Sequence, residues 1–121
     1  MTDSHLYYNP RCSKSRAALE LLLARGVSPQ VLAYLDEPPS REELHALVAM
    51  LDVPARHLLR TGEPEYAELG LDDPAKTDVQ LIAAMAAHPQ LIERPIFIHA
   101  GRAVVGRPPE RVLELLGTST S

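Results

Sequence analysis

The chain has very little cysteine: Cys12 is the only one among its 121 residues. An intramolecular disulfide is therefore impossible, which excludes a disulfide-stabilised fold and favours a reducing compartment. Long apolar runs are missing as well, because none approaches the roughly 18 residues that a membrane span requires. The N-terminus shows no cationic start followed by an apolar stretch. We therefore expect a cytoplasmic protein with no membrane partner and no signal peptide.

Basic charge is also scarce, and the net charge of −4 argues against general nucleic-acid binding. Lysine occurs only at Lys14 and Lys76, so ten of the twelve basic residues are arginine. The planar guanidinium of arginine suits oxyanions, although GC-rich coding would produce the same bias. One cysteine and five scattered histidines show no metal-ligand spacing, so we expect neither a metal site nor a bound cofactor.

The order of the predicted elements indicates a single α/β domain over residues 1–121. The hydrophobic content of 45% and charged content of 23% are typical of a globular chain. The expected elements are, in order, a strand at 6–8, a helix at 13–26, a strand at 31–35, a helical block at about 40–90, strands at 96–98 and 102–105, and a helix at 108–117. A β-α-β unit followed by a β-β-α unit is the plan of a thioredoxin-like sandwich, here with an inserted helical block.

Short local patterns mark where some of these elements begin and turn. Ser40 with Glu43 forms a capping-box pattern, and so does Thr77 with Gln80. The inserted block is therefore expected to contain at least two helices. Ala100-Gly101 separates the last two strands and predicts a tight hairpin.

Cys12 lies in the segment Tyr7-Tyr8-Asn9-Pro10-Arg11-Cys12-Ser13-Lys14-Ser15-Arg16, where the first strand passes into the first helix. Free backbone N–H groups and the dipole at the start of a helix favour the thiolate form of a cysteine. Arg11, Lys14 and Arg16 add positive charge nearby, so we predict that Cys12 is a catalytic nucleophile. The alternative is a small core residue, since free cysteines are commonly buried.

Two neighbours of Cys12 are candidates for a supporting role. Ser15 could donate a hydrogen bond to a thiolate across the first helical turn, or serve only as a helix-start residue. Asn9 could bond the thiolate or a substrate oxygen, or form an Asx turn. Because the chain has no second cysteine, an oxidised or adducted Cys12 must be resolved by an external thiol.

Three arginines in separate segments are candidates for binding an oxyanion. Arg94 precedes Pro95, which we expect to be a cis proline, because thioredoxin folds place one opposite the active cysteine here. Arg107 precedes Pro108, and Arg60 follows an apolar pair in the helical block. Each alone could be an ordinary surface residue. Together with a thiolate, the three would form a site for a tetrahedral oxyanion.

Five motifs follow one another between Leu6 and Leu116. They are Asn-Pro-x-Cys-x-x-Ser-Arg at 9–16, Leu-Leu-Arg at 58–60, Glu-Tyr-x-Glu-Leu-Gly-Leu at 65–71, Glu-Arg-Pro-Ile at 93–96 and Gly-Arg-Pro at 106–108. With these motifs the chain resembles the thioredoxin-fold, glutaredoxin-linked arsenate reductase family. The resemblance implies that the Cys12 thiolate attacks arsenate, that glutathione adds to the adduct, and that glutaredoxin then removes glutathione so that arsenite leaves.

The resemblance also implies roles for the residues that match the family motifs. Arg60, Arg94 and Arg107 match the arginines that hold the oxyanion and stabilise the thiolate. The remaining matches to supporting positions are Asn9, Ser15, Arg16 and Pro95.

Two features depart from the commoner family pattern. Tyr8 stands four residues before the cysteine where many members have a histidine thought to lower the thiol pKa, so Arg11, Lys14 and the helix are expected to contribute more to activation. The loop Cys12-Ser13-Lys14-Ser15-Arg16 differs from Cys-Gly-Thr-Ser-Arg and resembles a subgroup of the family.

Two alternatives to an arsenate reductase stay open. One is a related glutathione-linked thiol enzyme that acts on another substrate. The other is a regulator similar to the Spx proteins, which share this fold and bind RNA polymerase. Such regulators often carry a CxxC switch. Position 15 is serine here, which counts against this alternative.

Overall fold

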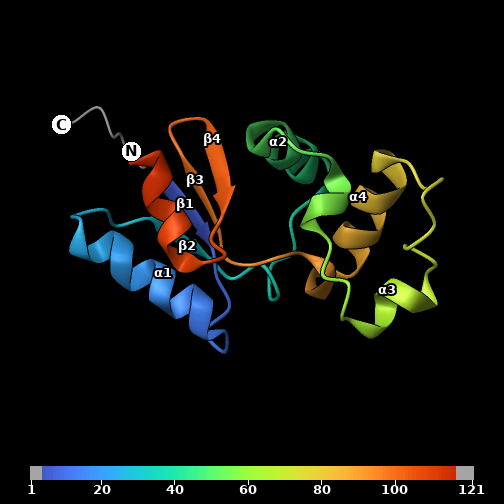
Figure 1. The fold of residues 1–121 in the computed structure, drawn as a ribbon, viewed down its shortest axis with the longest axis horizontal. Helices are drawn as coiled ribbons and strands as arrows, with labels where there is room; N and C mark the ends of the chain where they lie inside the picture. Colours follow the sequence, from blue (N-terminus) through green and yellow to red (C-terminus); the bar gives the residue numbers. More distant parts are fainter. Residues whose placement is uncertain (1–3, 117–121) are drawn as a thin grey trace. The chain divides into compact units, whose positions relative to one another are not determined.

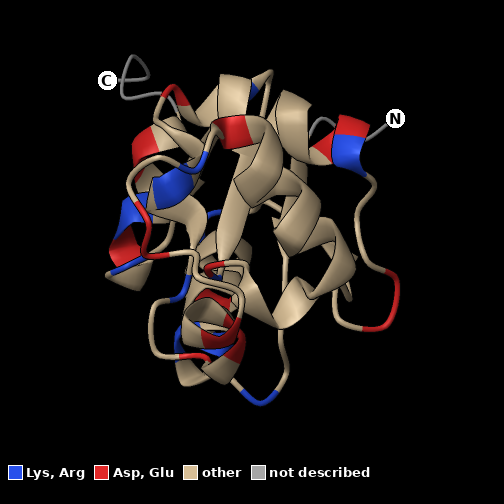
Figure 2. Ribbon diagram, turned by 90° about the vertical axis from the view of Figure 1, so that its right-hand side faces the viewer, with Lys and Arg blue, Asp and Glu red and all other residues tan. Residues whose placement is uncertain are grey.

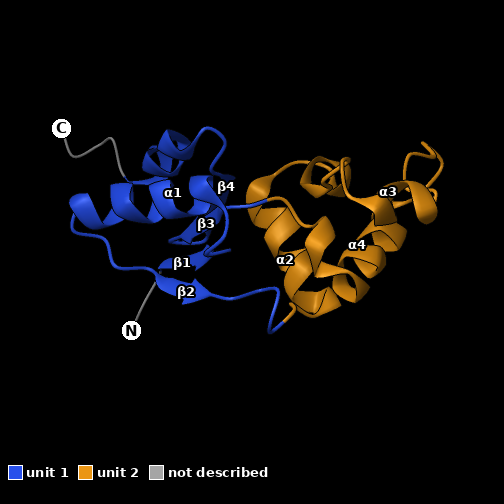
Figure 3. Ribbon diagram, turned by 90° about the horizontal axis from the view of Figure 1, so that it is seen from below, with its two compact units in different colours: residues 1–37, 94–121 blue, residues 38–93 orange. Residues whose placement is uncertain are grey.

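The computed structural model describes residues 4–116, which divide into two units (Figure 3). The first unit combines residues 1–37 with 94–121, and the second is the continuous segment 38–93. The second unit therefore interrupts the first one in the sequence, between its β-α-β segment and its last pair of strands.

A four-stranded sheet with the strand order β2-β1-β3-β4 forms the centre of the first unit (Figure 1). β1 (Ser4–Tyr7) pairs in parallel with β2 (Gln30–Leu32) and antiparallel with β3 (Ile96–His99). β3 in turn pairs antiparallel with β4 (Arg102–Val105). Because β1 and β3 are antiparallel neighbours, the end of β1 and the start of β3 lie side by side at the same end of the strands.

Two helices pack on one face of this sheet (Figure 1). α1 (Ser13–Ala24) connects β1 to β2, and the 3₁₀ helix η3 (Pro109–Leu115) follows β4. The core that they form with the sheet consists of Leu6, Ala18, Leu22, Phe97, Val104, Val112 and Leu115. Each large apolar side chain removed from water contributes roughly 1.5–3 kcal/mol, so this cluster is the main source of stability in the unit. The order β-α-β and then β-β-α confirms the predicted α/β, thioredoxin-like fold.

The second strand is shorter than the predicted range 31–35 because the chain turns immediately after Leu32. The backbone N–H of Tyr34 donates to the carbonyl oxygen of Leu32 at 2.9 Å, and that of Asp36 donates to Ala33 at 2.9 Å. These bonds replace the sheet pairing that a longer strand would have made. As a result, Tyr34 lies in a turn and its side chain is 1% exposed.

The last third of the chain follows the prediction closely. Ala100 and Gly101 have φ of 52° and 82°, and a two-residue turn with two positive φ values matches the twist of the flanking strands. The predicted hairpin is therefore confirmed. The segment that follows is a 3₁₀ helix rather than an α-helix, and its predicted end at residue 117 lies outside the described residues.

The second unit is built from helices. They are α2 (Arg41–Leu51), η1 (Ala55–Leu58), α3 (Pro64–Glu68), α4 (Asp78–Ala87) and η2 (Pro89–Leu91). Its fully buried large side chains are Leu44, Leu47, Leu58, Leu81, Ile82, Met85, Leu91 and Ile92. An isolated antiparallel bridge between Leu59 and Ile92 brings the segments after η1 and η2 together.

Both predicted capping boxes are present in the second unit. The Ser40 hydroxyl accepts from the Glu43 N–H at 3.0 Å, and the Glu43 carboxylate accepts from the Ser40 N–H at 2.8 Å. Thr77 and Gln80 make the same pair of bonds at the start of α4, at 3.2 and 2.8 Å. Each box satisfies two N–H groups that have no partner within the helix, so these sequence patterns fix where α2 and α4 begin.

Acidic and basic residues are interspersed along the helices (Figure 2). In α2, for example, Arg41 is followed directly by Glu42 and Glu43. Each unit therefore presents charge of both signs to the solvent. Among residues 4–116, no helix is both long and apolar enough to cross a membrane.

Candidate active site

Cys12 lies at the junction between β1 and α1, as predicted, and is the N-cap residue of the helix. Its N–H donates to the carbonyl oxygen of Asn9 at 2.9 Å, while the Asn9 side-chain oxygen accepts from the N–H of Arg11 at 3.0 Å. The second bond is an Asx turn, the local structure that an asparagine at this position favours. Arg16 donates from its guanidinium to the carbonyl oxygen of Pro10 at 2.7 Å. These bonds fix the turn that presents the thiol.

The surroundings of the sulfur lower the pKa of Cys12 from its ordinary value of 9.0 to about 7. Partial burial raises this pKa, but hydrogen bonds to the sulfur outweigh the effect of burial. The groups whose influence lowers the pKa are the Ser15 N–H, the Ser15 hydroxyl, the Arg94 guanidinium and the Lys14 N–H. About half of the protein therefore carries a thiolate at neutral pH, which is the reactive form of a cysteine.

Ser15 contributes to this environment in two ways. It is fully buried in α1, and its hydroxyl oxygen accepts from the N–H of Asn9 at 3.4 Å. A hydroxyl that accepts one bond still has its own proton to donate, and the Ser15 hydroxyl lowers the pKa of Cys12.

Lys14 and Arg11, the neighbouring cations that were expected to activate Cys12 by their charge, differ in how they relate to the thiol. Lys14 lowers the thiol pKa through its backbone N–H, and the Arg11 side chain is exposed to solvent. The guanidinium of Arg94, which was expected near Cys12, also lowers this pKa. Tyr8, at the position of the family histidine, packs against the core of the first unit. Activation therefore comes from the start of the helix, Ser15 and Arg94.

Arg94 stands at the start of β3, beside the end of β1 that leads to Cys12. The Arg94–Pro95 peptide is cis, which confirms the expectation for Pro95, and the Arg107–Pro108 peptide is also cis. Partial burial opposes the charged form of Arg94, but the influence of Cys12 and Tyr34 raises its pKa.

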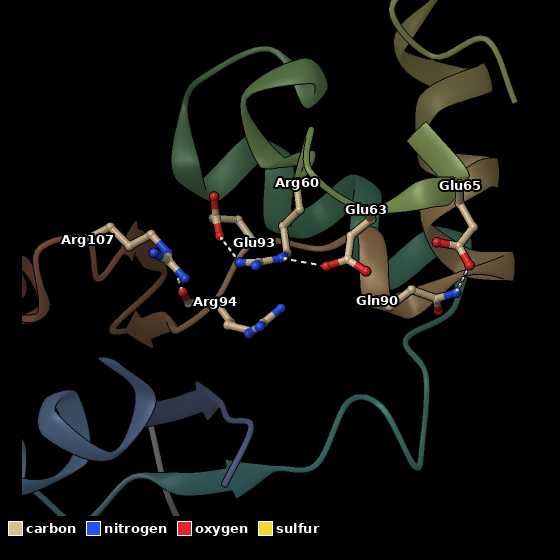
Figure 4. A network of polar contacts seen from close by, with 7 residues as sticks. All are labelled: Arg60, Glu63, Glu65, Gln90, Glu93, Arg94 and Arg107. Carbon is tan, nitrogen blue, oxygen red and sulfur yellow. Dashed lines mark hydrogen bonds and ion pairs between the residues drawn. The ribbon is translucent and has the colours of Figure 1, made fainter. Parts of the chain in front are cut away.

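The side chain of Arg107 forms a hydrogen bond with the backbone of Arg94. Its Nε donates to the carbonyl oxygen of Arg94 at 2.8 Å (Figure 4). The first unit thus brings together two of the three predicted arginines. Guanidinium groups supply the positive charge and directed donors with which proteins bind tetrahedral oxyanions.

Gly106 is a residue of the site that the sequence patterns did not single out by itself. A Cβ atom at this position would lie 2.9 Å from Cγ of Pro95 and 3.0 Å from Cγ1 of Val112. The N–H of Gly106 donates to the carbonyl oxygen of Pro95 at 2.8 Å. Only glycine permits this approach, so Gly106 sets the distance between the segments that carry Arg94 and Arg107.

Arg60 lies in the second unit, where carboxylates hold its side chain. Its guanidinium is 2.9 Å from Glu93 and 3.4 Å from Glu63 (Figure 4). Its backbone N–H donates to the carbonyl oxygen of Leu91 at 2.8 Å. Its part in oxyanion binding stays a prediction.

A cavity of about 380 Å³ adjoins the turn that carries Cys12. Its lining residues come from the segments after β1 and β2 and are Tyr8, Asn9, Pro10, Arg11, Ala33, Leu35 and Asp36. The volume is within the range of small-molecule sites, and the lining carries one basic and one acidic side chain.

A thioredoxin-like unit with a single low-pKa cysteine at the first strand–helix junction, next to arginine, defines a thiol-dependent enzyme of the thioredoxin class. The chain belongs to the ArsC family, whose pattern it matches over residues 7–115.

Relatives and solved structures agree with this assignment. The chain is 47% identical to the uncharacterized protein YfgD of Escherichia coli (strain K12) over 93% of its length and 95% of that protein. It is 45% identical to an arsenate reductase of Neisseria meningitidis serogroup B over 96% of its length and 100% of that protein. An arsenate reductase structure from Vibrio cholerae matches with a TM-score of 0.90 and 50% identity, covering 93% of this chain and 96% of that one.

Proposed function

We propose that this protein is an arsenate reductase that converts arsenate to arsenite with Cys12 as its nucleophile. The observation that carries the proposal is the place of Cys12 as the N-cap residue of α1, where its pKa is lowered to about 7 and about half of the thiol is ionised at neutral pH. Relatives named arsenate reductases cover nearly the whole chain at 45% identity. An oxyanion substrate also accounts for the second guanidinium, that of Arg107, on the Arg94 segment.

In the first step the Cys12 sulfur attacks arsenic and one arsenate oxygen leaves as water after it gains protons. The S–As bond forms and an As–O bond breaks, while arsenic stays in the +5 state. Arg94 and Arg107 are proposed to bind the remaining oxygens, and Arg60 is proposed to be a third residue that binds them. Donors that are already in place when negative charge develops stabilise the transition state without further reorganisation.

Reduction to the +3 state needs two electrons, and this chain has no second cysteine to supply them. We propose that glutathione adds to the arsenic and displaces a second oxygen as water. A glutaredoxin thiolate then attacks the glutathione sulfur and forms a mixed disulfide. The electron pair of the As–S bond that breaks remains on arsenic, and water releases arsenite from Cys12.

The cavity beside the Cys12 turn is the proposed site for glutathione. Glutathione carries two carboxylates and one ammonium group, and the cavity offers Arg11 and Asp36 as partners of opposite charge. Its volume of about 380 Å³ is sufficient for a small peptide. Because glutathione and glutaredoxin act in the reducing cytoplasm, we also propose a cytoplasmic location.

The test is an arsenite-formation assay with purified protein. Arsenite should form when glutathione and glutaredoxin are both present, and omission of either should abolish turnover. Cys12→Ser should be inactive, while Ser13→Ala, an exposed neighbour in the same turn, should be active. No arsenite from the complete mixture would refute the proposal.

A further inference from the structure

Asn9 is a buried polar residue that holds the Cys12 turn with three of its four polar groups. The residue is 8% exposed. Its backbone N–H donates to the Ser15 hydroxyl at 3.4 Å, and its backbone carbonyl oxygen accepts from the Cys12 N–H at 2.9 Å. Its side-chain oxygen Oδ1 accepts from the Arg11 N–H at 3.0 Å. The fourth group is the side-chain NH2, whose nitrogen is Nδ2.

The Asx turn fixes the direction of this NH2 group. An NH2 group cannot accept a hydrogen bond, so Oδ1 must face the Arg11 N–H and Nδ2 must lie on the opposite side of the amide. Of the residues that the structure describes, none accepts a hydrogen bond from Nδ2. Nor is Nδ2 one of the fully buried side-chain atoms without a partner in that part of the chain, so it reaches solvent. Asn9 therefore keeps an oriented donor for a ligand.

The solvent-filled space next to Asn9 is the cavity of about 380 Å³ beside the Cys12 turn. Asn9 lines this cavity, and so do both of its neighbours in the sequence, Tyr8 and Pro10. Arg11 and Asp36 supply one charge of each sign to the same lining. The amide of Asn9 adds an uncharged donor, and an uncharged donor suits the carbonyl oxygen of a peptide group.

We propose that Asn9 is a binding residue whose Nδ2 donates a hydrogen bond to a peptide carbonyl oxygen of glutathione in this cavity. The proposal rests on the proposed function, which places glutathione there. Arg11 and Asp36 match the charged ends of the tripeptide, and Asn9 matches the uncharged amide groups between them. Because the turn already fixes the donor, little side-chain freedom is lost when the ligand binds. The Asx turn and the binding role of Asn9 are therefore compatible, and the first makes the second possible.

The side-chain NH2 signal of Asn9 in a proton–nitrogen NMR spectrum tests this bond directly. Asn9 is the only asparagine of the chain, so its signal is identified by its loss in Asn9→Ser. The probe is S-methylglutathione, whose blocked sulfur cannot react with arsenic or with Cys12. One of the two Asn9 protons should shift downfield as the probe is added. The NH2 signal of Gln30, an exposed residue at the other end of β2, is the internal control and should not move.

The same titration gives the Kd of S-methylglutathione in the wild type and in variants. In Asn9→Ser the hydroxyl can still accept from the Arg11 N–H, but the NH2 group is gone. Loss of one hydrogen bond should raise the Kd on the order of 3- to 10-fold. Gln30→Ser is the matched control and should bind as the wild type does. Should Asn9→Ser be unfolded, Asn9→Asp keeps the acceptor and the shape of the side chain, and it should also bind more weakly.

Inorganic phosphate separates glutathione binding from oxyanion binding. An Asn9 signal that moves with phosphate and not with S-methylglutathione would assign the donor to the oxyanion and overturn the proposal. A wild-type Kd in Asn9→Ser would overturn it as well, and so would a wild-type protein that does not bind the probe. A moving Asn9 signal and weaker binding by Asn9→Ser, in a protein that forms no arsenite, would support this proposal and refute the proposed function.

Discussion

Arg107 donates from Nε to the carbonyl oxygen of Arg94 at 2.8 Å, so the two guanidinium groups of the first unit are fixed to one short segment. The bond crosses from the end of β4 to the start of β3. It uses only one of the five N–H donors of Arg107. We propose that the same guanidinium also binds the oxyanion.

Arg107→Ala is predicted to weaken arsenate reduction strongly. The substitution removes a donor to the oxyanion and the bond to Arg94, so kcat/KM for arsenate should fall by on the order of 10². The matched control is Arg102→Ala, which removes an exposed arginine from the other end of β4. Wild-type kinetics for Arg107→Ala would exclude this residue from the site.

Ser15→Ala is predicted to raise the pKa of Cys12 from about 7 toward 9.0. The hydroxyl stabilises only the thiolate, so its loss favours the protonated form. Alkylation by iodoacetamide should be slower than wild type near pH 7 and should approach the wild-type rate above pH 9, where both proteins are ionised. Ser13→Ala is the control, and equal midpoints in all three proteins would contradict the role of Ser15.

Arg11→Gln and Asp36→Asn are predicted to affect glutathione and not arsenate. Both side chains line the cavity beside the Cys12 turn, and exposed charge pairs contribute about 0.2–1 kcal/mol. The KM for glutathione should therefore rise on the order of 2- to 5-fold. Arg25→Gln removes an exposed charge beyond the other end of α1 and is the control. A change confined to the KM for arsenate would argue against a glutathione site here.

Gly106→Ala is predicted to destabilise the protein by about 1–3 kcal/mol, because the added methyl group overlaps Pro95 and Val112. The melting temperature should fall, and arsenate reduction should fall with it as the Arg94 segment moves. Gly62→Ala is the matched control, since a Cβ atom at that position has nothing within 4 Å. Equal melting temperatures for the two variants would show that the close approach is not rigid.

Features that depend on neighbours in the sequence could be predicted. The capping box of Ser40 and Glu43, the hairpin at Ala100-Gly101 and the position of Cys12 at a strand–helix junction all follow from a few adjacent residues. The order of elements then defined the thioredoxin-like fold, and with it the cis peptide before Pro95.

Features that depend on residues far apart in the sequence could not be predicted. Tyr34 was assigned to a strand, and its stacking on Tyr7 arises only after the chain turns at Leu32. The influence of Arg94 on the Cys12 pKa was expected only from the family resemblance, because no pattern of adjacent residues links positions 12 and 94. The need for glycine at position 106 likewise comes from the packing of Pro95, which the sequence pattern does not describe.

The most direct test of this account is a pH titration of the thiol in the wild-type protein, followed by the ultraviolet absorbance of the thiolate. Because Cys12 is the only cysteine, the signal belongs to one group, and Cys12→Ser supplies the baseline. The structure predicts a pKa of about 7 for Cys12. A value near the free-cysteine reference of about 8.5 would contradict the claim that the helix start, Ser15 and Arg94 activate this thiol.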